Sequence, residues 1–189
     1  MDGIVDLGKL DCSGCPALVL RDECLEWIRH CEELRECELR RIGSVRCFIL
    51  AESIPYRNFI YDLNTRSRLR SNLMREFNVG SPQELLNFLR EKGVLIVDLA
   101  LCPLHRLNKI YGKKAKSLRR RAATFCFEKH TYKYVELHPE AKIVLVVPSR
   151  CGLLKRSKAY NMIKDKIVAE FKFSRIDGLR EIIGGCMNG

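Results

Sequence analysis

Three short apolar runs constrain the fold of this chain more than any other feature. Residues 45–51, 94–101 and 142–147 consist largely of Val, Ile, Leu, Phe and Ala. Short runs of this kind are typical of β-strands that are buried on both faces, as strands are in a parallel sheet. We therefore expect these three runs to form the centre of such a sheet.

Helical patterns lie between the runs. Ser81 suits an N-cap, Pro82 suits the first turn, Glu84 completes a capping box, and Gly93 ends the helix just before the second run. Further helices are expected from residue 64 or 65, over residues 117–137 ahead of Pro139, and over residues 158–170, with a weak fourth strand at residues 171–174.

Alternating strands and helices predict a three-layer α/β/α fold with a mostly parallel, four-stranded sheet, whose ligand site lies at the carboxyl ends of the strands. The length of 189 residues fits a single domain over residues 1–189. Residues 1–40 form a cysteine-containing helical preface to it. A helix that begins near Asp22 places five apolar residues on one face, which indicates a buried stripe: Cys24, Trp27, Ile28, Cys31 and Leu34.

The ten cysteines need an explanation that suits an intracellular protein. No apolar stretch is long enough to span a bilayer, and the first residues lack the pattern of a signal peptide, so we expect a cytoplasmic protein without a membrane partner. Reduced cysteines in that compartment favour metal binding or simple burial. The single glutamine, Gln83, and the many charged residues suit a thermophile, in which disulfides remain an alternative.

Charge is distributed unevenly along the chain. The net charge is +11, yet residues 1–40 carry ten acidic and five basic side chains. Residues 99–127 contain no acidic residue, and a stretch of one sign attracts polyanions, of which nucleic acid is the commonest in a cell. A solvated helix face without a ligand is the alternative. Eight cations in this segment are the predicted phosphate contacts: Arg106, Lys109, Lys113, Lys114, Lys116, Arg119, Arg120 and Arg121.

Two loops at the ends of predicted strands hold candidate functional groups. The loop after the first strand contains Glu52 and three aromatic rings, Tyr56, Phe59 and Tyr61, which could stack on a base or simply pack. The loop after the second strand begins with Asp98, a carboxylate that is costly to bury unless it is paired or functional. Pairing and function are both left open for Asp98.

Four cysteines could form one thiolate site if the fold brings them together. Cys12 and Cys15 form a Cys-x-x-Cys pair, Cys102 follows the second predicted strand, and Cys126 lies thirteen residues before Pro139. Soft thiolates suit iron-sulfur clusters and zinc.

These spacings resemble the uracil-DNA glycosylase superfamily, and most closely its thermophile-rich branch with a 4Fe-4S cluster, often called family 4. The resemblance covers roughly residues 10–150. Residues 51–55 (Ala-Glu-Ser-Ile-Pro) are similar to the Gly-Glu-Ala-Pro-Gly motif of that branch, and Asp98 stands four residues before Cys102, where the branch has asparagine. The resemblance implies a 4Fe-4S cluster, with zinc or no metal as alternatives, on Cys12, Cys15, Cys102 and Cys126.

The chain also departs from the family pattern. Ala51 replaces the opening glycine of the first motif, and Ile54 is an extra residue before the proline. The family's late His-Pro-Ser motif has only a weak counterpart in residues 148–150, so we expect its catalytic histidine to be missing. An ionised Asp98 accepts hydrogen bonds but cannot donate them as asparagine does, which leaves the identity of the base open.

The resemblance implies a DNA-repair protein that hydrolyses the N-glycosidic bond of a damaged or deaminated base. In that reading Glu52 positions water or stabilises positive charge on the sugar, Asp98 meets the base, and Tyr56, Phe59 or Tyr61 stacks on it. Two alternatives remain: an iron-sulfur nucleic-acid-binding module that has lost catalysis, and a small α/β enzyme that acts on a nucleotide.

Overall fold

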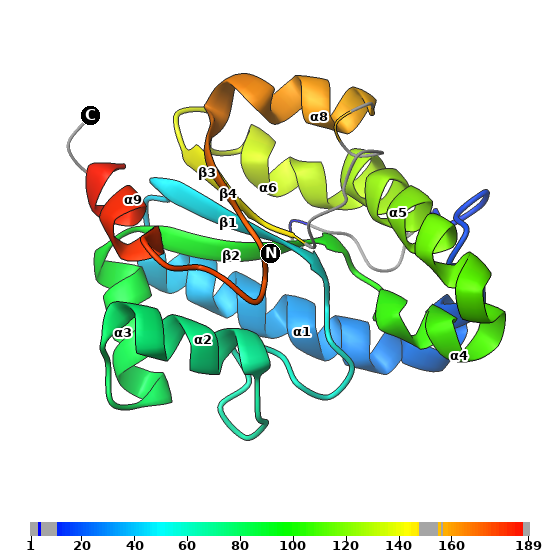
Figure 1. Ribbon diagram of the computed structural model, residues 1–189, viewed down its shortest axis with the longest axis horizontal. Coiled ribbons are helices and arrows are strands. Elements are labelled where there is room, and N and C mark those ends of the chain that lie inside the picture. The colour runs from blue at the N-terminus through cyan, green and yellow to red at the C-terminus, as the bar shows by residue number, and fades with distance from the viewer. Residues whose placement is uncertain (1–3, 5–10, 148–154, 156, 187–189) are drawn as a thin grey trace.

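The centre of the molecule is a sheet of four parallel strands in the order β2-β1-β3-β4. The computed structural model describes residue 4, residues 11–147, residue 155 and residues 157–186. The three-layer α/β fold and the parallel sheet predicted from the sequence are confirmed (Figure 1). The strands are β1 (Cys47–Ser53), β2 (Val94–Ala100), β3 (Lys142–Val146) and β4 (Ile167–Phe171).

Helices cover both faces of this sheet (Figure 1). One layer contains α1 (Arg21–Ile42), α2 (Arg68–Phe77) and α3 (Pro82–Glu91). The other contains α5 (Ala115–Cys126), α6 (Tyr132–Glu136) and α8 (Lys158–Ile163). The remaining elements are η2 (Leu18–Leu20), η3 (Leu104–Arg106), α4 (Leu107–Tyr111), η4 (Gly112–Lys114), the π-helical η5 (Phe127–Thr131), η6 (Lys164–Lys166) and α9 (Leu179–Gly185).

The capping box predicted for α3 is present. Ser81 Oγ accepts a hydrogen bond from the Glu84 N–H at 3.2 Å, and the Glu84 carboxylate accepts one from the Gly80 N–H at 2.8 Å. Gly93 follows with φ of +61°, and a Cβ there would lie 2.8 Å from the Ser44 carbonyl oxygen. Glycine is therefore required where the chain turns from α3 into β2.

The two central strands and β2 form the buried core, as their apolar runs predict. All seven residues of β2 are buried, and β1 is buried from Cys47 to Ala51. The register pairs Ala51 with Asp98, so the two candidate carboxylate loops leave the sheet side by side. Within the described residues, no helix is both long and apolar enough to cross a membrane.

The prediction for residues 158–174 was wrong in part. The helix α8 ends at Ile163, and residues 167–171 form β4 instead of continuing the helix, so the fourth strand lies before the predicted position. Residues 167–171 alternate between half-buried and exposed, which is the period-2 pattern of a strand at the edge of a sheet. Ile163 and Ile167 also match helical spacing, and the pairing of β4 with β3 decides between the two structures.

The buried face of α1 changes character along the helix. Its first half buries the predicted stripe of Cys24, Ile28 and Cys31, while Trp27 and Leu34 are half-buried. The same face then continues with Glu32, Arg35 and Glu38, which are also buried. Since buried charges require partners, the second half of α1 points to a polar network beneath the sheet.

Candidate functional site

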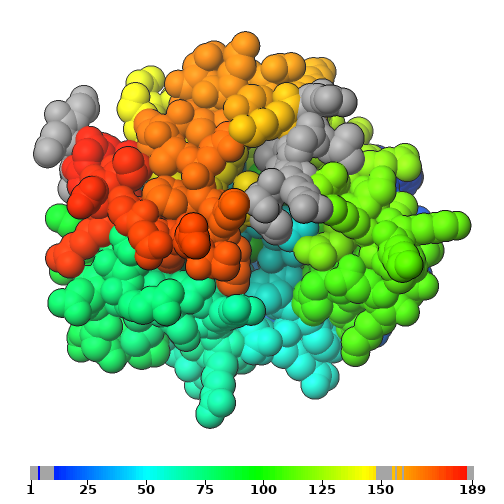
Figure 2. All heavy atoms as spheres, viewed as in Figure 1, coloured from blue at the N-terminus to red at the C-terminus, as the bar shows by residue number. Residues whose placement is uncertain are grey.

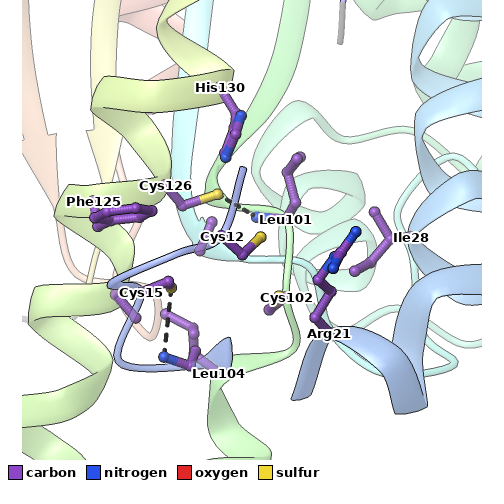
Figure 3. A pocket seen from close by; sticks show the side chains of 13 residues that line it. Cys12, Cys15, Arg21, Ile28, Leu101, Cys102, Leu104, Phe125, Cys126 and His130 are labelled. Atoms are coloured by element: carbon purple, nitrogen blue, oxygen red, sulfur yellow. Dashed lines mark hydrogen bonds between the residues drawn. The ribbon is translucent and has the colours of Figure 1, made fainter. Parts of the chain in front are cut away.

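The fold brings the four predicted ligand cysteines to one cavity (Figure 3). Cys12 and Cys15 come from the loop before η2, Cys102 from the loop after β2, and Cys126 from the last residue of α5. All four cysteines therefore line the same cavity, and their role as the ligands of one metal centre stays a prediction. Nine other residues complete the wall: Ala17, Arg21, Ile28, Ala100, Leu101, Leu104, Ala122, Phe125 and His130.

Local hydrogen bonds shape the Cys-x-x-Cys loop. The Cys15 N–H donates to the Cys12 carbonyl at 2.9 Å, and Gly14 adopts a φ of +77° within that turn. The Asp11 carboxylate accepts from the Ser13 N–H at 2.9 Å, and the Ala17 N–H donates to Cys15 Sγ at 3.4 Å. The loop thus holds both of its thiols on the side of the cavity.

Burial keeps the four thiols neutral in the absence of a metal. It raises the pKa of Cys12 and Cys15, raises that of Cys102 to about 12, and raises that of Cys126 well above its usual range. Binding of a metal would displace these protons, because thiolates and not thiols are metal ligands. The cavity therefore offers four soft sulfur donors, and the ionisation of these thiols depends on whether a metal binds.

Two features of the wall suit an iron-sulfur cluster. The Leu101 N–H donates to Cys126 Sγ at 3.3 Å, and hydrogen bonds to sulfur are one means by which proteins tune such clusters. The buried Arg21 Nε has no hydrogen-bond partner within the described residues, so its N–H is available to a cluster sulfide or thiolate. The donor set and this cation suit the group in their chemistry. The cavity itself measures only about 20 Å³, and no three His, Cys, Asp or Glu side chains in the described chain are arranged to hold one metal ion, so its walls would have to move apart to admit a cluster.

A second, larger cavity of about 900 Å³ opens at the carboxyl ends of β1, β2 and β3. Glu52 from β1, Asp98 from β2 and Val146 from β3 lie in its wall, together with Phe59. We call it the basic cavity, because arginines line both of its sides. In Figure 2 the segment that follows β1, coloured cyan, lies between α2 and the α4–α5 segment on this face.

Glu52 is held by an arginine of the predicted phosphate-binding segment. Arg119 Nη2 donates to both carboxylate oxygens, at 2.9 and 2.7 Å. The Nε of Arg119 is buried and has no hydrogen-bond partner within the described part of the chain. A polar ligand in the cavity can therefore gain a hydrogen bond from this side chain, and the ion pair keeps Glu52 oriented.

Asp98 is both paired and at the cavity. Arg35 Nη2 donates to its Oδ2 at 2.6 Å, and Arg35 also pairs with Glu32, which accepts a hydrogen bond from the Tyr134 hydroxyl at 2.9 Å. Burial raises the pKa of Asp98 to about 6, against the opposing effect of the Arg35 charge. This network accounts for the buried Glu32 and Arg35 of α1 and places Asp98 in the cavity wall, whereas the buried Glu38 pairs with Arg90 and Arg41.

His105 is the residue of this cavity that the sequence reasoning missed. His105 is the second residue of η3, which comes shortly after β2, and it lines the same cavity as Arg119 and Asp98. Burial and the nearby charges of Arg119, Arg106 and Lys109 lower its pKa, so the imidazole is neutral at pH 7. The signal that could have found it is its position seven residues after Asp98, within the loop that also supplies Cys102.

The three predicted base-stacking aromatics have different surroundings. Phe59 lies in the wall of the basic cavity and beneath the Arg35 guanidinium, at 5.1 Å from the ring centroid. Tyr61 is buried away from it, and its hydroxyl accepts from the Ile96 N–H at 2.6 Å. Tyr56 packs edge-on against Trp27. Of the three rings, Phe59 alone borders the basic cavity, but its side chain is fully buried, so a molecule there would reach the ring only after a covering side chain such as Arg35 moved.

The eight predicted phosphate contacts also divide into three groups. Arg106 pairs with Glu23 and Arg119 pairs with Glu52, so these two cations already have protein partners. Arg120 is half-buried. The remaining five side chains are exposed on α4, η4 and α5: Lys109, Lys113, Lys114, Lys116 and Arg121.

Fold and site together define an α/β protein with a cysteine cavity and a basic cavity that share the β2 loop and α5. Comparison with protein-family models, with curated proteins and with solved structures gives no match. The similarity to 4Fe-4S uracil-DNA glycosylases therefore stays a prediction that rests on this chain's own residues.

Proposed function

We propose that this protein binds DNA at the basic cavity, carries a 4Fe-4S cluster on its four cavity cysteines, and hydrolyses the N-glycosidic bond of a damaged or deaminated base. The observation that carries the proposal is the placement of Cys12, Cys15, Cys102 and Cys126 around one cavity, directly beside a cavity that contains Glu52, Asp98 and His105. The proposal places the protein in the cytoplasm, where cysteines stay reduced.

The cluster would be a structural clamp. When bound, it would join the N-terminal loop, the β2 loop and the end of α5 through four Fe–S bonds. Arg21 would offset part of the negative charge of the four thiolates, since its charge already favours the ionised forms of Cys12 and Cys102. His105 and Arg119 lie on the same two segments as Cys102 and Cys126, so the clamp would also support the basic cavity.

The chemistry proposed for the basic cavity follows from its side chains. A base turned out of the DNA would enter the cavity and stack on Phe59. Asp98 would accept a hydrogen bond from the base. Glu52 would orient the attacking water and stabilise positive charge on the sugar. The C1′–N bond would break with its electron pair leaving on the base, the water oxygen would bond to C1′, and Glu52 would take the proton that the water loses. Neutral His105 would stabilise the departing base with a hydrogen bond.

A direct test is base release from oligonucleotides that contain uracil, hypoxanthine, xanthine or oxidised guanine, as single strands and as duplexes. We expect at least one to be cleaved, and Glu52→Gln to lower the rate by about 10²- to 10⁴-fold, the usual contribution of a general acid or base. Glu140→Gln is the matched control, because Glu140 is exposed and outside both cavities. An equal rate of base release in both variants would show that Glu52 takes no part in the reaction.

One observation favours a second candidate, a nucleic-acid-binding module without catalysis. Both oxygens of Glu52 accept hydrogen bonds from Arg119, so this carboxylate already has a structural partner that does not depend on catalysis. Salt-sensitive binding of the oligonucleotides without base release would support this candidate. The absence of salt-sensitive binding would contradict both and favour a small-molecule substrate, because a small ligand displaces few counterions.

A further inference from the structure

The basic cavity has a second charged side that the sequence analysis did not assign to any function. Arg66 and Arg68 lie in its wall, on the segment that leads into α2, and both side chains are exposed. Ser67 stands between them as the N-cap of α2 and accepts a hydrogen bond from the Arg70 N–H at 3.3 Å. We call the pair of arginines the α2 rim. His105 and Arg119 form the opposite side.

The charges of this cavity leave the α2 rim available for an anion. Glu52 is paired with Arg119 and Asp98 is paired with Arg35, so both carboxylates of the wall already have cationic partners. No ion pair joins Arg66 or Arg68 to a carboxylate within the described residues, and the first turn of α2 contains no acidic residue. The positive end of the α2 dipole adds to the same potential.

Contacts with neighbouring residues fix the position of the α2 rim. Arg70 is buried and donates to the carbonyls of Ile60 and Asp62 at 3.1 and 2.8 Å, which ties the loop after β1 to α2. The guanidinium of Arg68 lies over the Phe173 ring, at 6.0 Å from its centroid. The α2 rim is thus carried by an anchored loop, which favours a role in recognition over that of a solvated surface charge.

We propose that the α2 rim is a second phosphate-binding surface, and that a nucleic-acid strand crosses the mouth of the basic cavity with phosphates held on both sides. This inference rests on the proposed function and adds to the phosphate contacts predicted from the sequence, which all lie between Arg106 and Arg121. A strand fits the arrangement better than a small phosphorylated molecule, because the exposed Lys109, Lys113 and Lys114 lie outside the cavity on α4 and η4, between the segments that carry His105 and Arg119. A strand held on both sides would present one nucleotide to Glu52 and Phe59.

The test compares the salt dependence of oligonucleotide binding by wild type and by Arg66→Gln/Arg68→Gln. Two lost contacts to a single strand should lower the slope of log K against log salt by about 1.4. Arg75→Gln is the matched control, because Arg75 is an exposed arginine near the other end of α2 and outside the cavity, and it should leave the slope unchanged. Arg66→Gln alone retains the Arg68 contact with Phe173 and should give about half the effect.

The outcomes separate this inference from the function on which it rests. If wild type shows no salt-sensitive binding, the proposed function fails. A different pattern would overturn the inference alone. In that pattern wild type binds, Lys113→Gln/Lys114→Gln weakens binding, and the α2-rim variants bind as well as wild type. Titration with inorganic phosphate is the last arm: an α2-rim variant that loses affinity for phosphate but keeps its affinity for the oligonucleotide would also overturn it.

Discussion

The two cavities differ in how they treat charge, although they share the same segments of chain. In the basic cavity each carboxylate already has an arginine: Glu52 has Arg119, and Asp98 has Arg35. In the cysteine cavity four thiols are kept neutral by burial beside one arginine, Arg21. The basic cavity is therefore organised by the protein itself, whereas the chemistry proposed for the cysteine cavity would depend on a bound metal centre.

The loop after β2 shows how closely the two are joined. Asp98 near the end of β2 and His105 in η3 line the basic cavity, while Leu101 and Cys102 between them line the cysteine cavity. The helix α5 divides in the same way, with Arg119 on one side and Cys126 on the other. A change in the cysteine cavity should therefore alter the structure of the basic cavity. The following predictions test how far this dependence extends.

The largest effect is expected from Cys126→Ser. A hydroxyl is a poor ligand for iron, so loss of one thiolate should remove most of the cluster and lower the thermal stability of anaerobically prepared protein. Cys37→Ser is the control, because Cys37 is a half-buried residue of α1 outside the cavity. The measurements are iron content and the unfolding temperature. Equal iron content in the two variants would show that Cys126 is not a metal ligand.

Next in size is Arg35→Met, which should destabilise the fold by about 3–5 kcal/mol, because it leaves Asp98 and Glu32 buried without their cation. Arg40→Met on the exposed face of the same helix should change the free energy of unfolding by less than about 1 kcal/mol. Urea denaturation measures both. A small loss for Arg35→Met would show that the basic cavity is not organised by this network.

Asp98 should give a smaller, pH-dependent effect. Its pKa is raised to about 6 in the folded protein, so the folded state holds this proton more tightly than the unfolded chain does. Stability should therefore fall as pH rises from about 4 to about 6, by an amount on the order of 3 kcal/mol.

Asp98→Asn should remove this component of the pH profile, whereas the exposed control Asp177→Asn should retain it. Unfolding by urea at several pH values provides the comparison. If the profiles of wild type and Asp98→Asn coincide, burial does not control the ionisation of this carboxylate.

The smallest effect is expected from His105. Since its pKa is lowered, it gains a proton only in mildly acidic solution, where a positive imidazole would strengthen binding of an oligonucleotide a few-fold. His105→Gln should lose this increase, while His138→Gln, whose histidine lies outside both cavities against Phe48, should keep it. Fluorescence anisotropy between pH 5 and pH 8 would measure the difference. An increase that persists without His105 must come from another group.

Local signals made much of the fold predictable from the sequence. The Ser81 cap, the Gly93 turn and the apolar runs each depend on residues close together in the chain, and each is found in the structure. The strand β4 was misplaced because five residues at a sheet edge carry a weak pattern that only pairing with β3 resolves.

The partners of the functional residues were less predictable, because they are distant in the chain. Arg35 lies 63 residues before Asp98, and Glu52 lies 67 residues before Arg119. No local periodicity links such pairs. The four cysteines could be predicted as a group only through their spacing relative to strands, and His105 was overlooked because a lone histidine in a loop has no distinguishing pattern. The late motif at residues 148–150 lies outside the described residues.

The most direct test of the central claim is the metal and sulfide content of wild-type protein purified without oxygen. A 4Fe-4S cluster on Cys12, Cys15, Cys102 and Cys126 predicts about four iron and about four inorganic sulfide per chain, in brown protein with broad absorbance near ~400 nm. Colourless protein without iron, or protein with about one zinc per chain and no sulfide, would contradict it.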